Sequence, residues 1–348
     1  MRSHAIAVIA GDGLGPKVFN ECQRVLDASA DNFGLEWVSY PYGATHYLKK
    51  GETLPDAGLQ EISTFDAIYL GPIGHPKVRP AAMERHFFRR MRSCFDQYVC
   101  LRHAKLYENI PTVFSDLDSK DVDFYIVREN TEGFYKDIGG TFWERTGSEM
   151  AVQAGVVSRL GCERIMRYAF ELARNKKRHL VTSCDKANTL PHSSFLWRKV
   201  LCEVSRNYRG IRTEFNLVDS IIQSLITNPS HYGVIVAPNM FGDVLGELAA
   251  LLQGGSGMAH TANINPKGIS AFGPIPSIMN MSARNANPIG SILAGAMMLE
   301  NIGEKRASAR VKKAVSDVLR TGKHRTPDIG GRSTTSRVGE AIEKGLGK

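Results

Sequence analysis

The strongest constraint on the fold is the alternation of short apolar runs with longer helical patterns along the whole chain. The short runs have the length of strands, are rich in β-branched or aromatic residues, and often precede turns that contain glycine or asparagine. They occupy residues 5–10, 65–71, 124–127, 178–184 and 232–237. Between them, apolar residues recur at three- and four-residue spacing, which is typical of helices. These helical patterns occupy residues 18–28, 162–173 and 195–206. The alternation predicts an α/β fold.

Length and hydropathy indicate a soluble protein with a sizeable core. The chain has 348 residues, of which 43% are hydrophobic, enough for one large α/β domain or two packed lobes. No stretch approaches the ~18 uninterrupted apolar residues that a membrane helix needs. The first residues lack the apolar region and the cleavage site of a signal peptide. We therefore expect neither export nor a membrane partner.

Cysteine usage and charge bear on the compartment and the partners. The six cysteines form no C-x2-C pair and lie within patterns typical of helices or strands, so we expect reduced thiols in the cytoplasm. The net charge of +9 comes from scattered residues, without an aromatic-interleaved basic stripe. A net positive charge also suits an enzyme that binds a polyanionic substrate. We therefore expect no nucleic-acid partner.

A glycine-rich segment, Gly11-Asp-Gly-Leu-Gly-Pro16, follows the first predicted strand and precedes a predicted helix. Its spacing differs from the G-x-G-x-x-G fingerprint that binds dinucleotide pyrophosphates. Glycine supplies the backbone angles that tight turns demand. Taken alone, the segment favours a strand-to-helix turn.

Arginines form a second candidate constellation. Guanidinium groups bind carboxylates through two parallel hydrogen bonds, so convergent arginines suit a di- or tricarboxylate. For Arg85 and Arg90 an exposed helix face is the better explanation. Arg128 directly follows the apolar run 124–127 and so stands at a strand end, where α/β proteins bind ligands. The set consists of Arg79, Arg85, Arg89, Arg90, Arg92, Arg102 and Arg128.

Acidic residues follow the apolar run 232–237, in the segment Asn239-Met-Phe-Gly-Asp-Val-Leu-Gly-Glu247. The four-residue spacing places Asp243 and Glu247 on one helical face, where they offer hard oxygen ligands to Mg²⁺ or Mn²⁺. Such pairs are also common on exposed helices. Apolar neighbours favour burial here, and burying two carboxylates without a cation is expensive.

Lys186 and Asn188 lie in the segment Asp185-Lys-Ala-Asn188, directly after the apolar run 178–184. A lysine in a partly dry cleft can lose its proton and act as a base. Judged on these four residues alone, an ordinary surface turn is the better explanation.

Taken together and in this order, the segments resemble the β-decarboxylating dehydrogenases: isopropylmalate, isocitrate, homoisocitrate and tartrate/D-malate dehydrogenases. The similarity covers essentially the whole chain, and the stretch Phe95-Asp-Gln-Tyr98 looks closest to the tartrate/D-malate branch. The matching segments are residues 10–16, 92–102, 126–135, 184–198, 217–220, 239–247, 286–299 and 325–336.

The resemblance implies the two-lobed fold of isopropylmalate and isocitrate dehydrogenases, which is not a standard Rossmann fold. Residues 1–99 and 253–348 would form a discontinuous, cofactor-binding large lobe. Residues 100–252 would form a small lobe with the metal site and the dimer interface. In such enzymes the equivalents of Lys186 and Asp219 come from the neighbouring subunit. We therefore expect a homodimer with shared active sites.

The resemblance also implies roles for individual residues. Arg92, Arg102 and Arg128 would clamp the carboxylates of a malate-type hydroxy acid. Mg²⁺ or Mn²⁺ would be bound by Asp219, Asp243 and Glu247, the last of which is usually aspartate in the family.

The family resemblance also implies which residues carry out catalysis. Lys186, with Asp219, would serve in the proton relay that deprotonates the C2 hydroxyl as hydride leaves for the nicotinamide. The metal would polarise the new ketone, and Tyr135 would protonate C3 after CO2 departs. The resulting reaction is the oxidative decarboxylation of a (2R)-2-hydroxy acid with a 3-carboxylate.

The cofactor loop, residues 272–284, departs from the family pattern. Gly273 replaces the usual glutamate, Pro276 aligns with the usual histidine, and the acid that holds the adenine ribose has no counterpart. Lost hydrogen bonds should weaken NAD binding by ~1–3 kcal/mol for each group left unpaired. Arg284, Arg332 or Arg337 could instead meet the 2′-phosphate of NADP. We rank NAD ahead, with cofactor contacts at Asn188, Asn287, Arg284 and Arg337.

Two questions about function stay open in the sequence. Phe88 and Arg89 stand where isopropylmalate enzymes present leucines and isocitrate enzymes a serine, so an arginine there suggests a malate with an extra carboxylate or phosphonate. The alternative to an active enzyme is a non-catalytic or regulatory subunit of a heteromeric isocitrate dehydrogenase-like enzyme. The presence of Tyr135, Lys186, Asp219 and Asp243 favours the enzyme.

Overall fold

The computed structural model describes residues 2–114, 116–275 and 285–347 and has the α/β architecture that the sequence predicts. The chain divides into two compact units, which are described separately below. Unit 1 comprises Met1–Gln97, Arg102–Val122 and Ala249–Lys348, and unit 2 comprises Tyr98–Leu101 and Asp123–Leu248. The sequence interpretation gave residues 100–252 to a small lobe, whereas here Arg102–Val122 groups with the two chain ends.

The sheet of unit 1 is built from β1 (Arg2–Ile9), β2 (Phe33–Ser39), β3 (Ala67–Leu70), β11 (His260–Ile264) and β12 (Ala271–Pro274). Their order is β2-β1-β3-β12-β11. All neighbours pair in parallel except β11 and β12, which are antiparallel. β1 is buried from Ile6 to Ile9, as expected of a parallel strand covered on both faces. A further strand, β4 (Val99–Lys105), has residues in both units.

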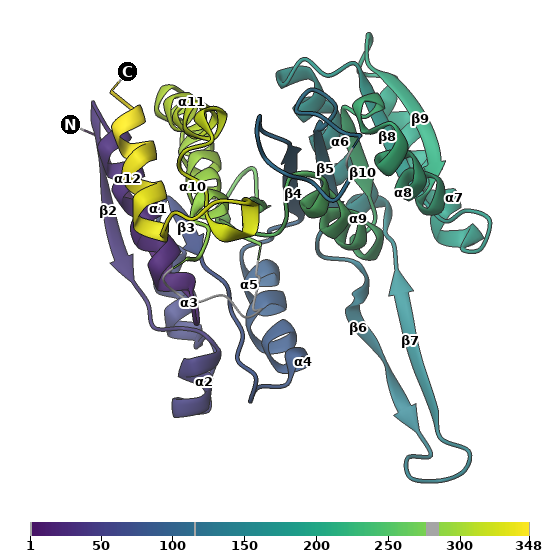
Figure 1. Cartoon of the computed structure of the whole chain (residues 1–348). Coiled ribbons are helices and arrows are strands. Elements are labelled where there is room, and N and C mark those ends of the chain that lie inside the picture. Colours follow the sequence, from purple (N-terminus) through teal and green to yellow (C-terminus); the bar gives the residue numbers. More distant parts are fainter. Residues whose placement is uncertain (1, 115, 276–284, 348) are drawn as a thin grey trace. The chain divides into compact units, whose positions relative to one another are not determined.

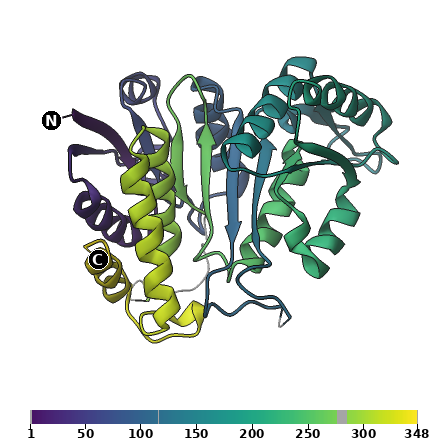
Figure 2. The ribbon, with the colours of Figure 1, turned by 90° about the horizontal axis from the view of Figure 1, so that it is seen from above.

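Helices cover this sheet. α10 packs on β11 and β12, and α1, α10, α11 and α12 pack on one another. Figures 1 and 2 show these helices from two directions. The helices of unit 1 are α1 (Gly15–Ser29), α2 (Ala44–Lys50), α3 (Asp56–Ile62), α4 (Pro80–Met83), the π-helical η1 (Glu84–Phe88), α5 (Arg89–Cys94), α10 (Ile289–Asn301), α11 (Lys305–Thr321), the 3-10 helix η3 (Pro327–Ile329) and α12 (Thr335–Gly345).

The glycine-rich segment forms the tight turn between β1 and α1. Gly11 and Gly13 have positive φ angles of 83° and 58°, and a side chain on Gly11 would collide with the Pro72 carbonyl. The Asp12 carboxylate accepts hydrogen bonds from the backbone N–H groups of Ala44 (2.8 Å) and Thr45 (2.9 Å) at the start of α2. The turn therefore also caps a neighbouring helix.

Unit 2 contains a parallel sheet in the order β5-β10-β8-β9. Its strands are β5 (Asp123–Glu129), β8 (Leu180–Asp185), β9 (Arg212–Leu217) and β10 (Val234–Ala237). Its helices are α6 (Arg159–Asn175), α7 (Pro191–Ser205), α8 (Val218–Thr227), the 3-10 helix η2 (Pro229–His231) and α9 (Asn239–Leu252), whose last residues belong to unit 1. Large buried side chains such as Phe124, Phe170 and Trp197 fill the core, each contributing roughly 1.5–3 kcal/mol by burial.

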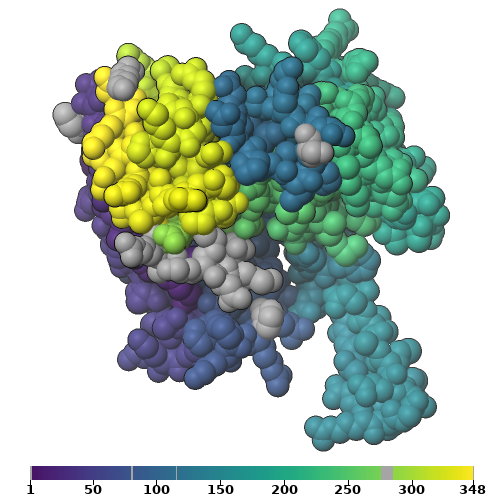
Figure 3. Space-filling model, in the orientation of Figure 1, coloured from purple at the N-terminus to yellow at the C-terminus, as the bar shows by residue number. Residues whose placement is uncertain are grey.

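A two-stranded antiparallel hairpin, β6 (Gly133–Phe142) and β7 (Met150–Val156), extends from unit 2 as an arm. Figure 3 shows this arm standing clear of the rest of its own unit. An isolated hairpin is only marginally stable in water. The arm exposes large apolar side chains, although side chains of this size and character are usually buried. These are Ile138, Phe142, Trp143, Met150, Val152 and Val156.

The expectations about thiols and membrane spans can be compared directly with the structure. All six cysteines are free thiols, as predicted. Within the described residues, no helix combines the length and the apolar character needed to cross a bilayer.

Candidate active site

The central cluster of the candidate site forms where β5 and β10 end. These parallel strands are neighbours, with Arg128 in register with Ala237, so their carboxyl ends meet at one edge of the sheet. Arg128 is the penultimate residue of β5, and α9 begins at Asn239, directly after β10. A side chain on Gly242 would lie 2.7 Å from Cβ of Arg128. Glycine in the first turn of α9 therefore permits the close approach of this helix to β5.

Three predicted site residues meet in this cluster. Arg128, only 4% exposed, donates from Nε to Oδ1 of Asn239 at 2.8 Å and from Nη1 to Oδ1 of Asp243. The Tyr135 hydroxyl donates to Oδ2 of Asp243 at 2.8 Å, and its ring lies 5.1 Å from the Arg128 guanidinium carbon. The Asp243 carboxylate thus holds the Tyr135 hydroxyl and the Arg128 guanidinium close together. The guanidinium can bind an anion, and the hydroxyl can deliver a proton.

Asn239 is a site residue that the sequence analysis did not single out. Besides holding Arg128, it donates from Nδ2 to the backbone carbonyl of Glu132 at 2.9 Å. The side chain is buried, so these bonds fix the direction in which the guanidinium points. The sequence could have indicated this residue, because Asn239 stands at the start of the helix that carries the predicted metal ligands.

The turn between β5 and β6 is fixed by two acids, the buried Glu129 and the partly buried Glu132. Glu129 accepts hydrogen bonds from the N–H groups of Thr131 and Glu132 and from the Thr131 hydroxyl. Burial raises the pKa of the Glu129 carboxyl, and these donors oppose that rise. Glu132 in turn accepts from the N–H (2.8 Å) and the hydroxyl (2.5 Å) of Ser158. The turn that separates Arg128 from Tyr135 is therefore rigidly held.

The environment of the acidic pair differs from the sequence expectation. Glu247 is exposed, and the Asp243 side chain is 34% exposed with its charge compensated by Arg128 inside the same chain. In the single chain the two carboxylates are therefore not buried, because α9 turns this face to the surface. The chemistry of the donors still fits Mg²⁺ or Mn²⁺, which prefer carboxylate oxygens.

A single chain does not assemble a three-ligand metal site from the part that the structure describes, because no group of three His, Cys, Asp or Glu residues there could hold a metal ion. Asp243 and Glu247 come from α9, and the third predicted ligand, Asp219, lies in the first turn of α8.

Lys186 and Asp219 form an ion pair in unit 2. They meet because β8 and β9 are parallel neighbours, with Asp185 in register with Leu217, and each residue follows the end of its strand. The side chains are 26% and 56% exposed. Asn188 lies exposed in the same turn. The structure thus joins two residues that the sequence could link only through the family resemblance.

In unit 1, the predicted substrate residues lie on η1, α5 and β4. Arg92 donates from Nη1 to Oε1 of Glu84 at 2.9 Å, and its guanidinium carbon lies 5.7 Å from the Phe88 ring centre. The buried Nε of Arg92 has no hydrogen-bond partner among the described residues. Arg89 is half-buried at the start of α5, and Arg102 is buried in β4. The π-helical turn before α5 was not predicted, and such turns often mark functional sites.

The predicted cofactor residue Asn287 lines a cavity of about 170 Å³ in unit 1. Its Nδ2 donates to Oδ2 of Asp328 at 3.0 Å. A side chain on Gly257 would come within 2.4 Å of this Asp328 oxygen, so glycine keeps the cavity open. Arg337 is exposed on α12, and its backbone N–H donates to the hydroxyl of Thr334, the residue that caps that helix. Arg284 and the rest of residues 276–284 lie outside the described residues.

Comparison with known proteins places these features in context. The profile of a family described as isocitrate/isopropylmalate dehydrogenase matches residues 5–342. The 3-isopropylmalate dehydrogenase of Thermobifida fusca is 38% identical, across 98% of this chain and 97% of that protein. The decarboxylating D-malate dehydrogenase of Escherichia coli is 37% identical, across 99% of each. The crystal structure of isocitrate dehydrogenase from Methylococcus capsulatus superposes with a TM-score of 0.88 at 33% identity, covering 99% of this chain and 100% of that one.

Proposed function

Because the chain belongs to the isocitrate/isopropylmalate dehydrogenase family, we propose that it oxidises a (2R)-2-hydroxy acid and releases the 3-carboxylate as CO2. The family makes the chain a decarboxylating dehydrogenase with the corresponding α/β fold. The observation that carries the proposal is the cluster of Arg128, Tyr135 and Asp243, in which an anion-binding group and a proton donor share one carboxylate.

The arginines are proposed to bind the substrate carboxylates. Arg128 is held by Asn239 and Asp243, so its orientation is set before substrate arrives. Arg92 keeps a buried Nε–H that a carboxylate can accept, while Glu84 and Phe88 hold the rest of its guanidinium. Arg102, buried in β4, is proposed as the third arginine of the clamp.

Two proton transfers are proposed for side chains of unit 2. Lys186 first gives a proton to the exposed Asp219 carboxylate, with which it is paired, and then takes the proton of the C2 hydroxyl as the neutral amine. Tyr135 gives its hydroxyl proton to C3 once CO2 has left. Asp243 holds the Tyr135 hydroxyl at 2.8 Å and so orients the proton that is transferred.

Asp219, Asp243 and Glu247 are proposed to bind Mg²⁺ or Mn²⁺. When bound, the cation supplies Lewis-acid polarisation of a substrate oxygen. Glutamate at position 247 keeps the charge of the usual aspartate and reaches one methylene further. Since the described part of one chain gathers no three-ligand group, we propose that Asp219 reaches the site of a second copy.

A homodimer with shared sites is supported by apolar surface. The arm exposes a row of large apolar side chains, and α9 exposes Met240, Val244 and Leu251 on the helix that carries the acidic pair. An exposed patch of this kind is uncommon on a monomer. We propose that a second copy covers these surfaces, which would bring its Lys186 and Asp219 to the acidic pair.

NAD is proposed as the cofactor, with NADP as the alternative. Asn287 and the glycine turn around Gly257 are proposed to receive it, and Asn188 to lie near the nicotinamide, which accepts the hydride. The lining of the cavity includes the carboxylate of Asp328 and, among the described residues, no arginine. A carboxylate favours ribose hydroxyls and disfavours the 2′-phosphate of NADP. The free thiols fit a reducing compartment, so we propose the cytoplasm.

The substrate is proposed to be a malate with an extra anionic group. Phe88 and Arg89 are the residues proposed to face this variable group, and a half-buried guanidinium suits a carboxylate or phosphonate. Plain D-malate would leave Arg89 without that anion.

The experiment is absorbance at 340 nm with Mg²⁺ or Mn²⁺, NAD or NADP, and D-malate, tartrate, 3-isopropylmalate, isocitrate or 3-phosphonomethylmalate. We expect NAD reduction to be fastest with an anion-bearing malate. Arg89→Ala should lower kcat/KM for that substrate by about 10–100-fold, because a charge-assisted hydrogen bond is lost. Arg85→Ala, an exposed neighbour, is the matched control and should change little. Equal turnover of D-malate and the anion-bearing malates, unchanged in Arg89→Ala, would contradict the substrate assignment.

A further inference from the structure

The proposed base, Lys186, stands on the short turn between β8 and α7. The N–H groups of Thr189 and Leu190 donate to the Lys186 carbonyl at 2.9 Å and 2.8 Å. The N–H of Ala187 donates instead to a side chain, at 3.0 Å to Oδ1 of Asp185. The conformation of this turn therefore depends on where the Asp185 carboxylate is held.

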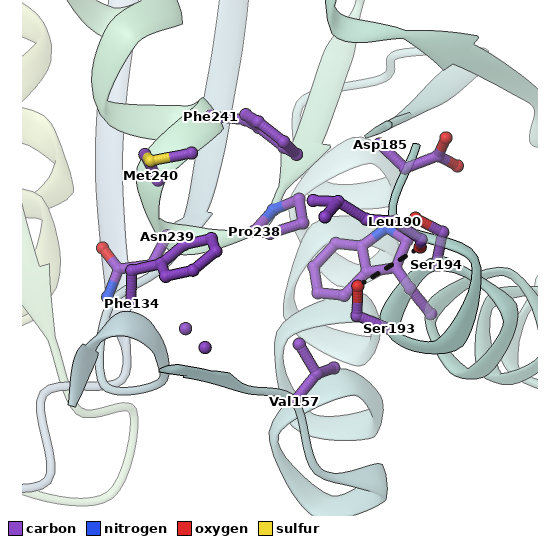
Figure 4. Close-up of a pocket in the computed structure, with 13 residues that line it drawn as sticks. Phe134, Val157, Asp185, Leu190, Ser193, Ser194, Pro238, Asn239, Met240 and Phe241 are labelled. Atoms are coloured by element: carbon purple, nitrogen blue, oxygen red, sulfur yellow. Dashed lines mark hydrogen bonds between the residues drawn. The ribbon is translucent and has the colours of Figure 1, made fainter. Parts of the chain in front are cut away.

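Asp185 is the last residue of β8, is only 1% exposed and is bound by one side chain of α7. Arg198 donates to it from Nε to Oδ2 at 2.5 Å and from Nη2 to Oδ1 at 2.9 Å. A guanidinium that binds both oxygens compensates the buried charge and also fixes the direction of the carboxylate. Figure 4 shows this direction: Asp185 lines a pocket of about 280 Å³, and its carboxylate points away from the pocket residues Phe134 and Phe241.

Arg198 also contacts the neighbouring strand. Its guanidinium carbon lies 5.3 Å from the ring centre of Phe215 in β9, within the range of cation–π contacts. β9 pairs in parallel with β8, and α8 follows it directly, with Asp219 in its first turn. One side chain of α7 therefore contacts both of the strands whose ends carry the Lys186–Asp219 ion pair.

We propose that Arg198 is a positioning residue for the proton transfer at Lys186. By binding the end of β8 and packing on β9, it sets the turn from which Lys186 reaches Asp219. This inference rests on the proposed function, in which Lys186 is the base. A misplacement of about 1 Å can cost about 100-fold in rate. Because the substrate carboxylates are assigned to other arginines, the loss of Arg198 should affect kcat rather than KM.

Kinetics of matched variants of the full-length protein test this role. Arg198→Ala should lower kcat by about 10–100-fold and change KM by less than about threefold. Arg198→Lys keeps the charge without the two-point contact and should have an intermediate kcat. Arg159→Ala is the control: Arg159 binds Glu203 in the last turn of α7 through two hydrogen bonds, whereas the Lys186 turn precedes the first. Its kcat should stay within about twofold of wild type.

Guanidinium ion separates positioning from a merely structural role. The Arg198 side chain is 38% exposed, so a small cation can enter the space that Arg198→Ala leaves beside Asp185. About 20 mM guanidinium chloride should raise the kcat of this variant by about fivefold, whereas sodium chloride at the same concentration should not. A variant that had lost only stability would gain nothing, because guanidinium favours unfolding. No gain in a folded Arg198→Ala protein overturns the proposal.

Hydrogen exchange tests the contact without turnover. The Ala187 N–H should exchange about tenfold faster in Arg198→Ala than in wild type or Arg159→Ala, because its acceptor is no longer held. If Arg198→Ala does not fold, Arg198→Lys serves in the same comparison. Unchanged exchange, or faster exchange with unchanged kcat, overturns the proposal. If wild type turns over no substrate, the proposed function fails, and the exchange result alone then decides whether Arg198 orders the turn.

Discussion

Replacement of His260 should make the stability of the protein less sensitive to acid. His260 begins β11 and is only 4% exposed. Burial, together with the charges of His103 and Lys312, lowers the pKa of its imidazole from 6.5 to about 3. The unfolded chain therefore binds a proton in a pH range where the native chain does not. Stability from this group is complete above pH 6.5 and is lost as the pH falls toward 3.

The size of the effect follows from the shift. Between pH 7.5 and pH 5.0, protonation of the unfolded histidine removes about 2 kcal/mol of stability, from roughly 1.5 pH units at 1.36 kcal/mol each. His260→Leu removes the titrating group while keeping an apolar side chain in the core. Urea unfolding at both pH values, on wild type and variant, isolates this histidine because all other groups titrate equally. If both proteins lose the same stability on acidification, the buried neutral state of His260 is refuted.

Three further perturbations test the turn and the site. Asp12→Ala should cost about 2 kcal/mol in urea unfolding, because α2 loses its cap; a change below about 0.5 kcal/mol would count against that role. Tyr135→Phe should lower kcat by about 100-fold or more while leaving substrate KM within a few-fold, since only a proton donor is removed; full activity would exclude Tyr135 as the donor. EDTA should abolish NAD reduction and Mn²⁺ should restore it, because carboxylates supply the proposed ligands; activity that survives exhaustive chelation would exclude the metal.

The sequence predicts the regular elements well because their patterns are local. The apolar runs at 124–127 and 232–237 became the neighbouring strands β5 and β10, and the helical pattern at 162–173 became part of α6. Arg128 was correctly placed at a strand end, since that inference needs only the preceding run. The strand-to-helix turn at Gly11 followed in the same way from the demands of backbone geometry.

Features that depend on tertiary contacts were not accessible in this way. The partners of Arg128 come from α9, more than a hundred positions away, and no spacing rule links them. The exposure of Glu247 is decided by which face of α9 packs inward, and its apolar neighbours suggested the opposite. The π-helical turn at Glu84–Phe88 has no sequence signal that we recognised, although it sets the register of Phe88 and Arg89.

The most direct test of the proposed reaction is the ratio of CO2 released to nicotinamide reduced. Purified protein, Mn²⁺, NAD and the best substrate of the panel would be incubated together, with absorbance at 340 nm and CO2 measured on the same sample. We expect one CO2 for each NADH, with both signals lost in Lys186→Met and both lowered by about 100-fold or more in Tyr135→Phe. Reduction without CO2 would contradict the decarboxylating role, and no reduction with any substrate by a folded dimer would contradict catalysis itself.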